Sequence, residues 1–234
     1  MTADSRLGGA WRTATQPVRL LAPVGLTLRR VATGDVWVEV ELEDDSSAGP
    51  DVDMPDAEAV QSPDEGVGPL HRRRYQVRIE GASMTADQLI EALRSDPNRL
   101  SPTSFAVFIP DPAPTGLTVG AEVEIKLPGP WNGPVRVADI EPSLLRLETL
   151  EDHMEAGRIE FTATEANDVL TFTIDSLATS GDQAFDLLYR KLRIAKQFQS
   201  EMWAQVLEAA VDISGGRQQG RLQFLTTVFT GEQP

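Results

Sequence analysis

The part of the chain that decides the fold is residues 144–177, LLRLETLEDHMEAGRIEFTATEANDVLTFTIDSL. Three runs in this stretch, 144–150, 157–165 and 169–177, alternate apolar and polar residues in the way that half-buried β-strands do. The pair Asn167-Asp168 between the last two runs is a turn signal. Because turns this short join antiparallel neighbours, we expect three consecutive strands of an antiparallel meander.

The same pattern extends towards the N-terminus. Three further β-type runs, each followed by a turn signal, precede this stretch: FAVFIP (105–110), AEVEIKL (121–127) and PVRVADI (134–140). Before them, residues 71–81, HRRRYQVRIEG, also alternate and predict a strand. No helical pattern interrupts the six runs from 105 to 177, so the sheet is expected to be antiparallel.

Two helices are expected on either side of the meander. Residues 85–88, Thr-Ala-Asp-Gln, form a capping box ahead of an apolar face that Pro97 ends. Residues 180–183, Ser-Gly-Asp-Gln, form a second capping box, and an apolar stripe at helical spacing follows it as far as Gly215-Gly216. This second helix is about 30 residues or about 45 Å long. The tail after it, residues 221–234, predicts a last strand or a docked peptide.

The N-terminal third differs in character. Residues 36–42 alternate strictly and predict an edge strand or a hairpin. Between residues 43 and 65 nine side chains are Asp or Glu and none is Lys or Arg, so this segment repels itself and predicts a linker. The run Arg72–Arg74 follows directly, and we expect it to pair with the acidic segment.

The composition excludes several classes of function. The 234 residues carry 36 acidic and 21 basic side chains, a formal net charge of -15, so the chain repels phosphate and nucleic acid is not an expected partner. Without cysteine there is no thiolate metal site, Fe–S cluster or cysteine nucleophile, and we expect neither a metal nor a cofactor. Because no apolar stretch approaches the roughly 20 residues that span a bilayer, and the polar start resembles no secretory signal, a cytoplasmic location is expected.

This order of elements resembles the helix-grip fold of START-like proteins, the SRPBCC or Bet v 1-like superfamily, in which a curved sheet wraps the last helix. In addition, Thr149–Gly157, followed by Phe161, resembles the T-L-x-G-H-P-x-x-G motif of an uncharacterised bacterial START-like family. Asp152 and Met154 stand where that motif has Gly and Pro. The resemblance implies an α+β helix-grip domain, a curved antiparallel sheet around a long C-terminal helix, with an N-terminal β-rich extension.

The chain therefore divides into four expected parts. Residues 1–42 are an N-terminal extension with an edge strand or hairpin, and residues 43–70 are an acidic linker. Residues 71–214 are the START-like domain, and residues 215–234 are a C-terminal tail.

His153 and Glu155 are the first candidate site residues. If they lie on a strand, side chains two apart point to the same face and can share a ligand. An imidazole beside a carboxylate can act as a general base or bind a polar head group. The alternative interpretation is structural: the two residues shape a turn or β-bulge for which Gly157 supplies an unusual backbone angle.

Three aromatic residues complete the candidate set. Trp131 lies in PGPWNGP, where it either forms the lip of a cavity mouth or anchors a loop. Tyr189 and Trp203 lie along the long helix, where they either fill the core or line a pocket.

The leading functional hypothesis follows from the resemblance. It is a non-enzymatic helix-grip domain that holds a small hydrophobic ligand in a cavity between the sheet and the C-terminal helix, with His153, Glu155, Trp131, Tyr189 and Trp203 as binding residues and no assigned catalytic residue. One alternative is an interaction or scaffold protein that acts through its acidic segment and the edge strand at 36–42. Another is a cyclase- or dehydratase-type enzyme with His153 as its base.

Overall fold

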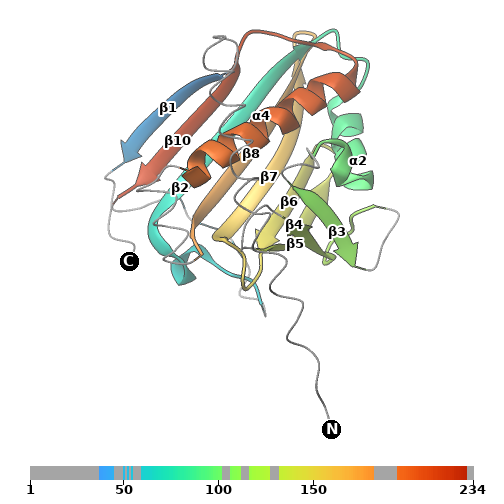
Figure 1. Ribbon diagram of the computed structural model, residues 1–234. Coiled ribbons are helices and arrows are strands. Elements are labelled where there is room, and N and C mark those ends of the chain that lie inside the picture. The colour runs from blue at the N-terminus through green and yellow to red at the C-terminus, as the bar shows by residue number, and fades with distance from the viewer. Residues whose placement is uncertain are drawn as a thin grey trace, which may run out of the picture.

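The computed structural model describes residues 37–44, 50, 52, 54, 59–101, 106–111, 116–126, 132–181 and 194–230. Its strands form one sheet (Figure 1). They are β1 (Trp37–Asp44), β2 (Val67–Glu80), β3 (Val107–Asp111), β4 (Glu122–Lys126), β5 (Asn132–Glu141), β6 (Leu144–Thr149), β7 (Glu155–Ala166), β8 (Val169–Ser180), β9 (Arg217–Gln218) and β10 (Leu222–Phe229).

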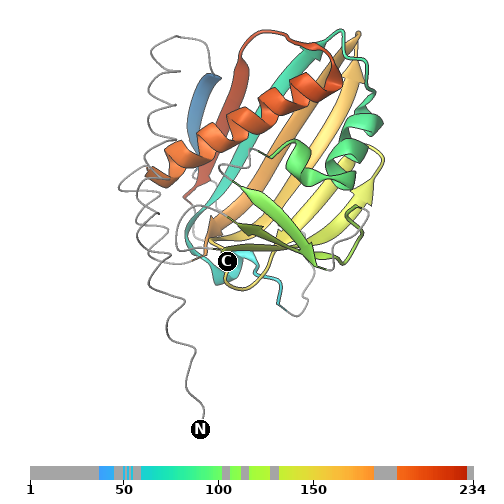
Figure 2. The same cartoon turned by 45° about the vertical axis from the view of Figure 1, so that its right-hand side comes forward.

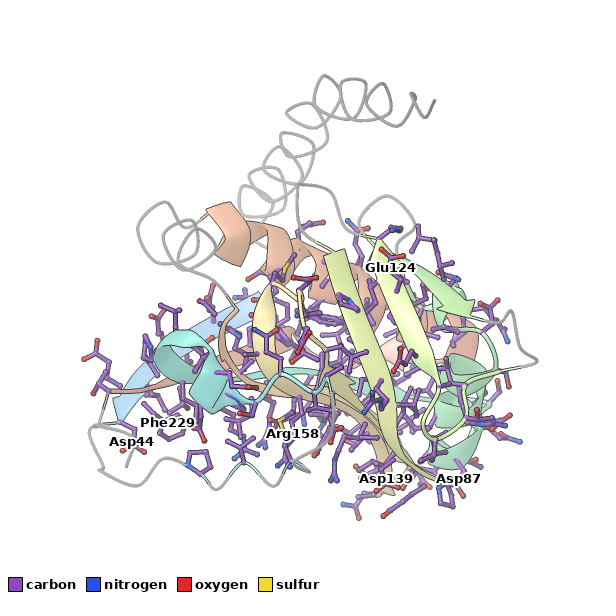
Figure 3. The ribbon with its side chains drawn as sticks, turned by 90° about the horizontal axis from the view of Figure 1, so that it is seen from below. Asp44, Asp87, Glu124, Asp139, Arg158 and Phe229 are labelled. Carbon is purple, nitrogen blue, oxygen red and sulfur yellow. The ribbon has the colours of Figure 1, made fainter. Side chains whose placement is uncertain are left out.

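The strand order is β1-β10-β2-β8-β7-β6-β5-β4-β3, and the short β9 also pairs with β2. Strands β3 to β8 are neighbours in chain order and all pair antiparallel, which confirms the predicted meander. The tail supplies a strand, β10, which pairs antiparallel with β2 on one side and parallel with β1 on the other. Asp44 and Phe229, register partners at the ends of β1 and β10, therefore lie at one corner of the molecule (Figure 3).

The helices are α2 (Ala86–Ser95) and α4 (Ile194–Ser214), with two single 3-10 turns, η1 (Pro63–Glu65) and η2 (Pro97–Arg99). The capping box at the start of α2 is confirmed: Thr85 Oγ1 accepts a hydrogen bond from Gln88 N at 3.2 Å, and Thr85 N donates to Gln88 Oε1 at 2.9 Å. The expected second capping box lies partly outside the described residues, as does the first part of the long helix. As predicted, α4 ends directly before Gly215, where φ is +71°.

Both helices lie on the same face of a curved sheet (Figures 1 and 2). Alternate residues of β2, among them Val77 and Ile79, are buried on that face together with Phe172 of β8 and Leu207 of α4. Full burial of each such side chain contributes about 2 kcal/mol to stability. A large, mostly antiparallel sheet that curves around a C-terminal helix fits the helix-grip fold.

The second half of the expected linker packs against the sheet. Gln61 N donates to Thr149 O at 2.9 Å, Glu151 N donates to Ala59 O at 2.9 Å, and the Thr179 hydroxyl donates to Pro63 O at 2.9 Å. Strand β2 then begins at Val67. Backbone groups of an acidic segment can pair with strands as well as any others, and the described acidic residues here, Asp64 and Glu65, are exposed. Where the domains of the chain begin and end stays a prediction.

The start of strand β7, directly after the β6–β7 connection, depends on a glycine at its third residue. Gly157 has φ +152°, and a Cβ at this position would lie 2.1 Å from Leu177 O. The Thr149 hydroxyl accepts from Gly157 N at 2.8 Å and lies 3.0 Å from Gly157 O, which holds this backbone in place. Glycine is therefore required at position 157, because the backbone angle φ is positive and because β8 approaches closely.

Gly157→Ala is expected to lower the free energy of unfolding by about 3 kcal/mol, because the methyl group adds overpacking to the cost of a positive φ. Gly81→Ala is the matched control: φ is +66°, but no heavy atom lies within 4 Å of the added Cβ, so the loss should be about 1 kcal/mol. Urea unfolding measures both variants, and equal losses would contradict the proposed steric requirement.

Candidate functional site

One end of the helix-covered face of the sheet is polar. Tyr75 of β2 pairs with Ile174 of β8, and both are buried in the core on this face. Two residues further along each strand, Arg73 and Ser176 form the next pair on the same face. Glu155, at the start of β7, belongs to the same alternating set because it pairs with Ser180. The sheet thus presents an apolar half and a polar end to the space beneath α4.

An ion pair joins the strands at this end. Arg73, which is 2% exposed, donates from Nη1 to Glu155 Oε1 at 2.9 Å. Gln199 of α4 donates from Nε2 to both Glu155 oxygens, at 3.3 and 3.4 Å. The pair therefore links β2, β7 and α4, and removing one member of such a buried pair typically costs about 3 to 5 kcal/mol.

Three buried polar atoms around this pair have no hydrogen-bond partner among the described residues. They are Ser176 Oγ, Gln199 Oε1 and Trp203 Nε1. Ser176 adjoins Arg73 in the sheet, Gln199 contacts Glu155, and Trp203 lies one helical turn beyond Gln199. Each such atom costs about 1 to 3 kcal/mol when buried without a partner, so their gathering at one place calls for an explanation.

An aromatic group borders the polar end. The Trp203 ring lies 5.9 Å from the Tyr75 ring and 6.1 Å from the Phe161 ring, measured between centroids. Tyr75 in turn meets Phe224 of β10 edge-on at 4.9 Å. Trp203 thus packs on the apolar half through its ring, one helical turn from Gln199, while its Nε1 atom has no partner among the described residues.

His153 lies in the turn before β7. His153 N donates to Leu150 O at 3.1 Å, and Asp152 between them has φ +69°. The ring atom Nδ1 lies 2.9 Å from Glu155 N and 2.8 Å from Glu155 O, so it bonds with the backbone of Glu155. The condition for a shared strand face is not met, because β7 begins only at Glu155.

The other candidates fall into two groups. Glu155 and Trp203 both lie at the polar end, while Trp131 and Tyr189 lie outside the described residues. Arg72 and Arg74 bind Asp175, at 3.1 and 2.7 Å, on the opposite face of the sheet. Pairing of Arg72–Arg74 with the acidic segment stays a prediction, because most of that segment's carboxylates lie outside the described residues. Arg158 of β7 also faces that side, away from α4 (Figure 3).

Sequence reasoning missed Arg73, Ser176 and Gln199. For the first two a signal existed. Arg73 continues the alternating series of Tyr75 and Val77, and Ser176 continues that of Ile174, so both polar residues occupy positions on the buried face of a strand. No comparable signal was available for Gln199, since a glutamine on a helix is usually exposed.

Neither a metal site nor a membrane helix is found in the described ranges. No group of three His, Asp or Glu residues there could hold a metal ion. Likewise, no helix in that part of the chain has the length and apolar character needed to cross a bilayer.

Burial lowers the pKa of His153 below its usual 6.5, although the Glu155 carboxylate acts in the opposite direction. The folded state then binds a proton less readily than the unfolded state. Stability from this residue is therefore present above pH 6.5 and is lost as the pH falls through that value towards the lowered pKa. We expect His153→Asn, which keeps a hydrogen-bond acceptor near Glu155 N, to flatten this part of the stability–pH curve. Urea unfolding between pH 5 and pH 8 tests this, and identical slopes in both proteins would contradict it.

Ser176→Ala is expected to raise the free energy of unfolding by about 1 kcal/mol, because it removes a buried hydroxyl that has no partner. Ser214→Ala is the matched control, since the Ser214 hydroxyl is equally buried but donates to Val211 O at 2.8 Å. Loss of the Ser214 hydroxyl should lower the free energy of unfolding by about 1 kcal/mol. Thermal unfolding compares the two, and a loss of stability in both would show that the Ser176 hydroxyl is satisfied.

Among known proteins, only solved structures of low sequence identity resemble this chain. No protein family model matches the sequence, and no curated protein matches it. Similar solved structures include the KanY protein, with 12% identity over 61% of this chain and 96% of the other and a TM-score of 0.46. The di-domain ARO/CYC StfQ of the steffimycin biosynthetic pathway has 10% identity over 65% and 52%, with a TM-score of 0.46. Hypothetical protein jhp0584 from Helicobacter pylori has 12% identity over 69% and 99%, with a TM-score of 0.45. These values assign neither a family nor a function to this chain.

Proposed function

We propose that this chain binds a small, largely apolar ligand between the helix-covered face of the sheet and α4, and acts by holding the ligand. One observation carries the proposal: Ser176 Oγ on β8 and Gln199 Oε1 and Trp203 Nε1 on α4 are buried beside an aromatic group and have no partner in the described part of the chain. Binding sites for small molecules have this composition, a mostly apolar lining with a few convergent polar groups.

In the absence of a ligand, the polar end of the site lowers the stability of the protein. Leaving three polar atoms unsatisfied destabilises the fold, and burying three apolar atoms instead would not. A ligand that places a polar group against these atoms and an apolar body against Trp203 and Phe161 removes that cost when it binds. Trp131 and Tyr189 remain in the proposal as predicted lining residues.

Catalysis is not part of the proposal. His153 lies in the turn before β7, not on the strand face that carries Glu155, and its Nδ1 bonds with the backbone of that residue. The Glu155 carboxylate is itself bound by Arg73 and Gln199. We further propose a cytoplasmic location. We also propose that the protein has no nucleic-acid partner, because its excess of acidic residues repels phosphate.

A second candidate function rests on β1, one of the two edge strands of the described sheet. Val40 and Leu42 on this strand are 43% and 50% exposed. Exposed apolar side chains on an edge strand favour the addition of a strand from a partner protein. This scaffold role and ligand binding use different parts of the molecule and do not exclude each other.

Titration of the full chain with the neutral apolar dye N-phenyl-1-naphthylamine tests ligand binding. We expect a saturable rise in dye fluorescence, which Trp203→Ala weakens about tenfold in affinity because the ring that borders the site is lost.

The control is Ile213→Ala, which removes an apolar contact near the other end of the same helix and should leave dye affinity unchanged. Circular dichroism shows that each variant is folded. A folded protein without saturable dye binding would overturn the proposal, as would equal dye affinity of the two variants.

A further inference from the structure

The polar end of the site holds a buried ion pair. Arg73 and Glu155 are 2% and 12% exposed, and their charged groups meet at 2.9 Å. At this end, the described residues of β2, β7, β8 and β10 that share the face with Arg73 and Glu155 are uncharged, with the exception of His71. On α4 the buried Glu201 accepts a hydrogen bond from Gln205 one turn along its own helix. On the described part of this face, a charged ligand group would meet only the ion pair, whose two charges are already matched, and His71, so its burial is costly.

The atoms without partners define what the site requires. Trp203 Nε1 is a donor only, Gln199 Oε1 is an acceptor only, and the Ser176 hydroxyl is both. The amide of Gln199 cannot be turned around, because its Nε2 group donates to the Glu155 carboxylate. A ligand group that satisfies these three atoms must both donate and accept hydrogen bonds.

We infer that the site recognises a neutral head group of the hydroxyl or carboxamide class on an apolar ligand, and discriminates against carboxylates and ammonium groups. This inference rests on the proposed function. A carboxylate has no donor for Gln199 Oε1, and an ammonium group has no acceptor for Trp203 Nε1. The charge balance of Arg73 with Glu155 and the donor–acceptor pattern lead independently to the same ligand class.

Three ligands with one chain length test the inference: 1-decanol, decanoate and decylammonium at pH 7.5, each competing with N-phenyl-1-naphthylamine for the full chain. We expect 1-decanol to displace the dye at a concentration at least tenfold lower than either charged compound. If the dye itself does not bind, the proposed function fails. If the dye binds but a charged compound competes as well as 1-decanol, or none competes, the head-group inference fails while ligand binding stands.

Glu155→Gln changes the charge balance with almost no change in shape. Arg73 then loses the carboxylate that faces it from β7, and decanoate should gain at least tenfold in affinity relative to 1-decanol. The matched control is Glu160→Gln on the opposite face of the same strand, where Glu160 binds Arg146 at 2.9 Å; it should leave the order of the three ligands unchanged. An unchanged order in Glu155→Gln would overturn the assignment of the head-group position.

Ser176→Ala provides a second variant should Glu155→Gln fail to fold. It leaves the ion pair intact and removes one hydroxyl that has no partner in the free protein. The affinity for 1-decanol should fall about fivefold, and clearly more than the affinity for the dye, which has no hydroxyl and whose only polar group is a secondary amine. An unaltered affinity for 1-decanol would exclude Ser176 from the head-group site and overturn the inference.

Discussion

The buried ion pair between Arg73 and Glu155 is the constraint on which the rest of the site depends. The two residues come from β2 and β7, and β8 lies between these strands. Because neighbouring strands are about 4.8 Å apart, the long Arg73 side chain must extend across β8 to reach the carboxylate. The residues that β8 presents to this face here are Ser176, Ala178 and Ser180, all of them small. Larger residues at these positions would obstruct the pair.

This constraint divides the helix-covered face into two parts with different roles. Beneath the second half of α4, the apolar side chains of β2 and β8 pack against Leu207 and Ala210 and supply stability. Beneath its first described turns, the small residues that admit the ion pair leave Ser176 Oγ and Gln199 Oε1 without partners. The same helix therefore stabilises the fold with one half and covers a costly polar site with the other.

Sequence reasoning predicted what local patterns control. Strands β3 to β8 and the start of α2 follow from alternation, turn residues and a capping box, all of which act over a few residues. The insertion of β10 between β1 and β2 could not be predicted, because alternation does not reveal which distant strand is the partner. In the site, Glu155 and Trp203 were identified, but Arg73 was grouped with its neighbours Arg72 and Arg74 although it points to the opposite face.

The segment around His153 is best understood through its effect on Glu155. The turn that ends at His153, with Asp152 at φ +69°, bonds through the imidazole to the backbone of Glu155. Two residues later, Thr149 and the close approach of β8 hold Gly157. Residues 59–66 bind this connection from the other side through Gln61 and Ala59. The imidazole thus holds the backbone of Glu155 directly, and the other contacts hold the chain on both sides of it, which helps this carboxylate at the end of a strand to meet a guanidinium two strands away.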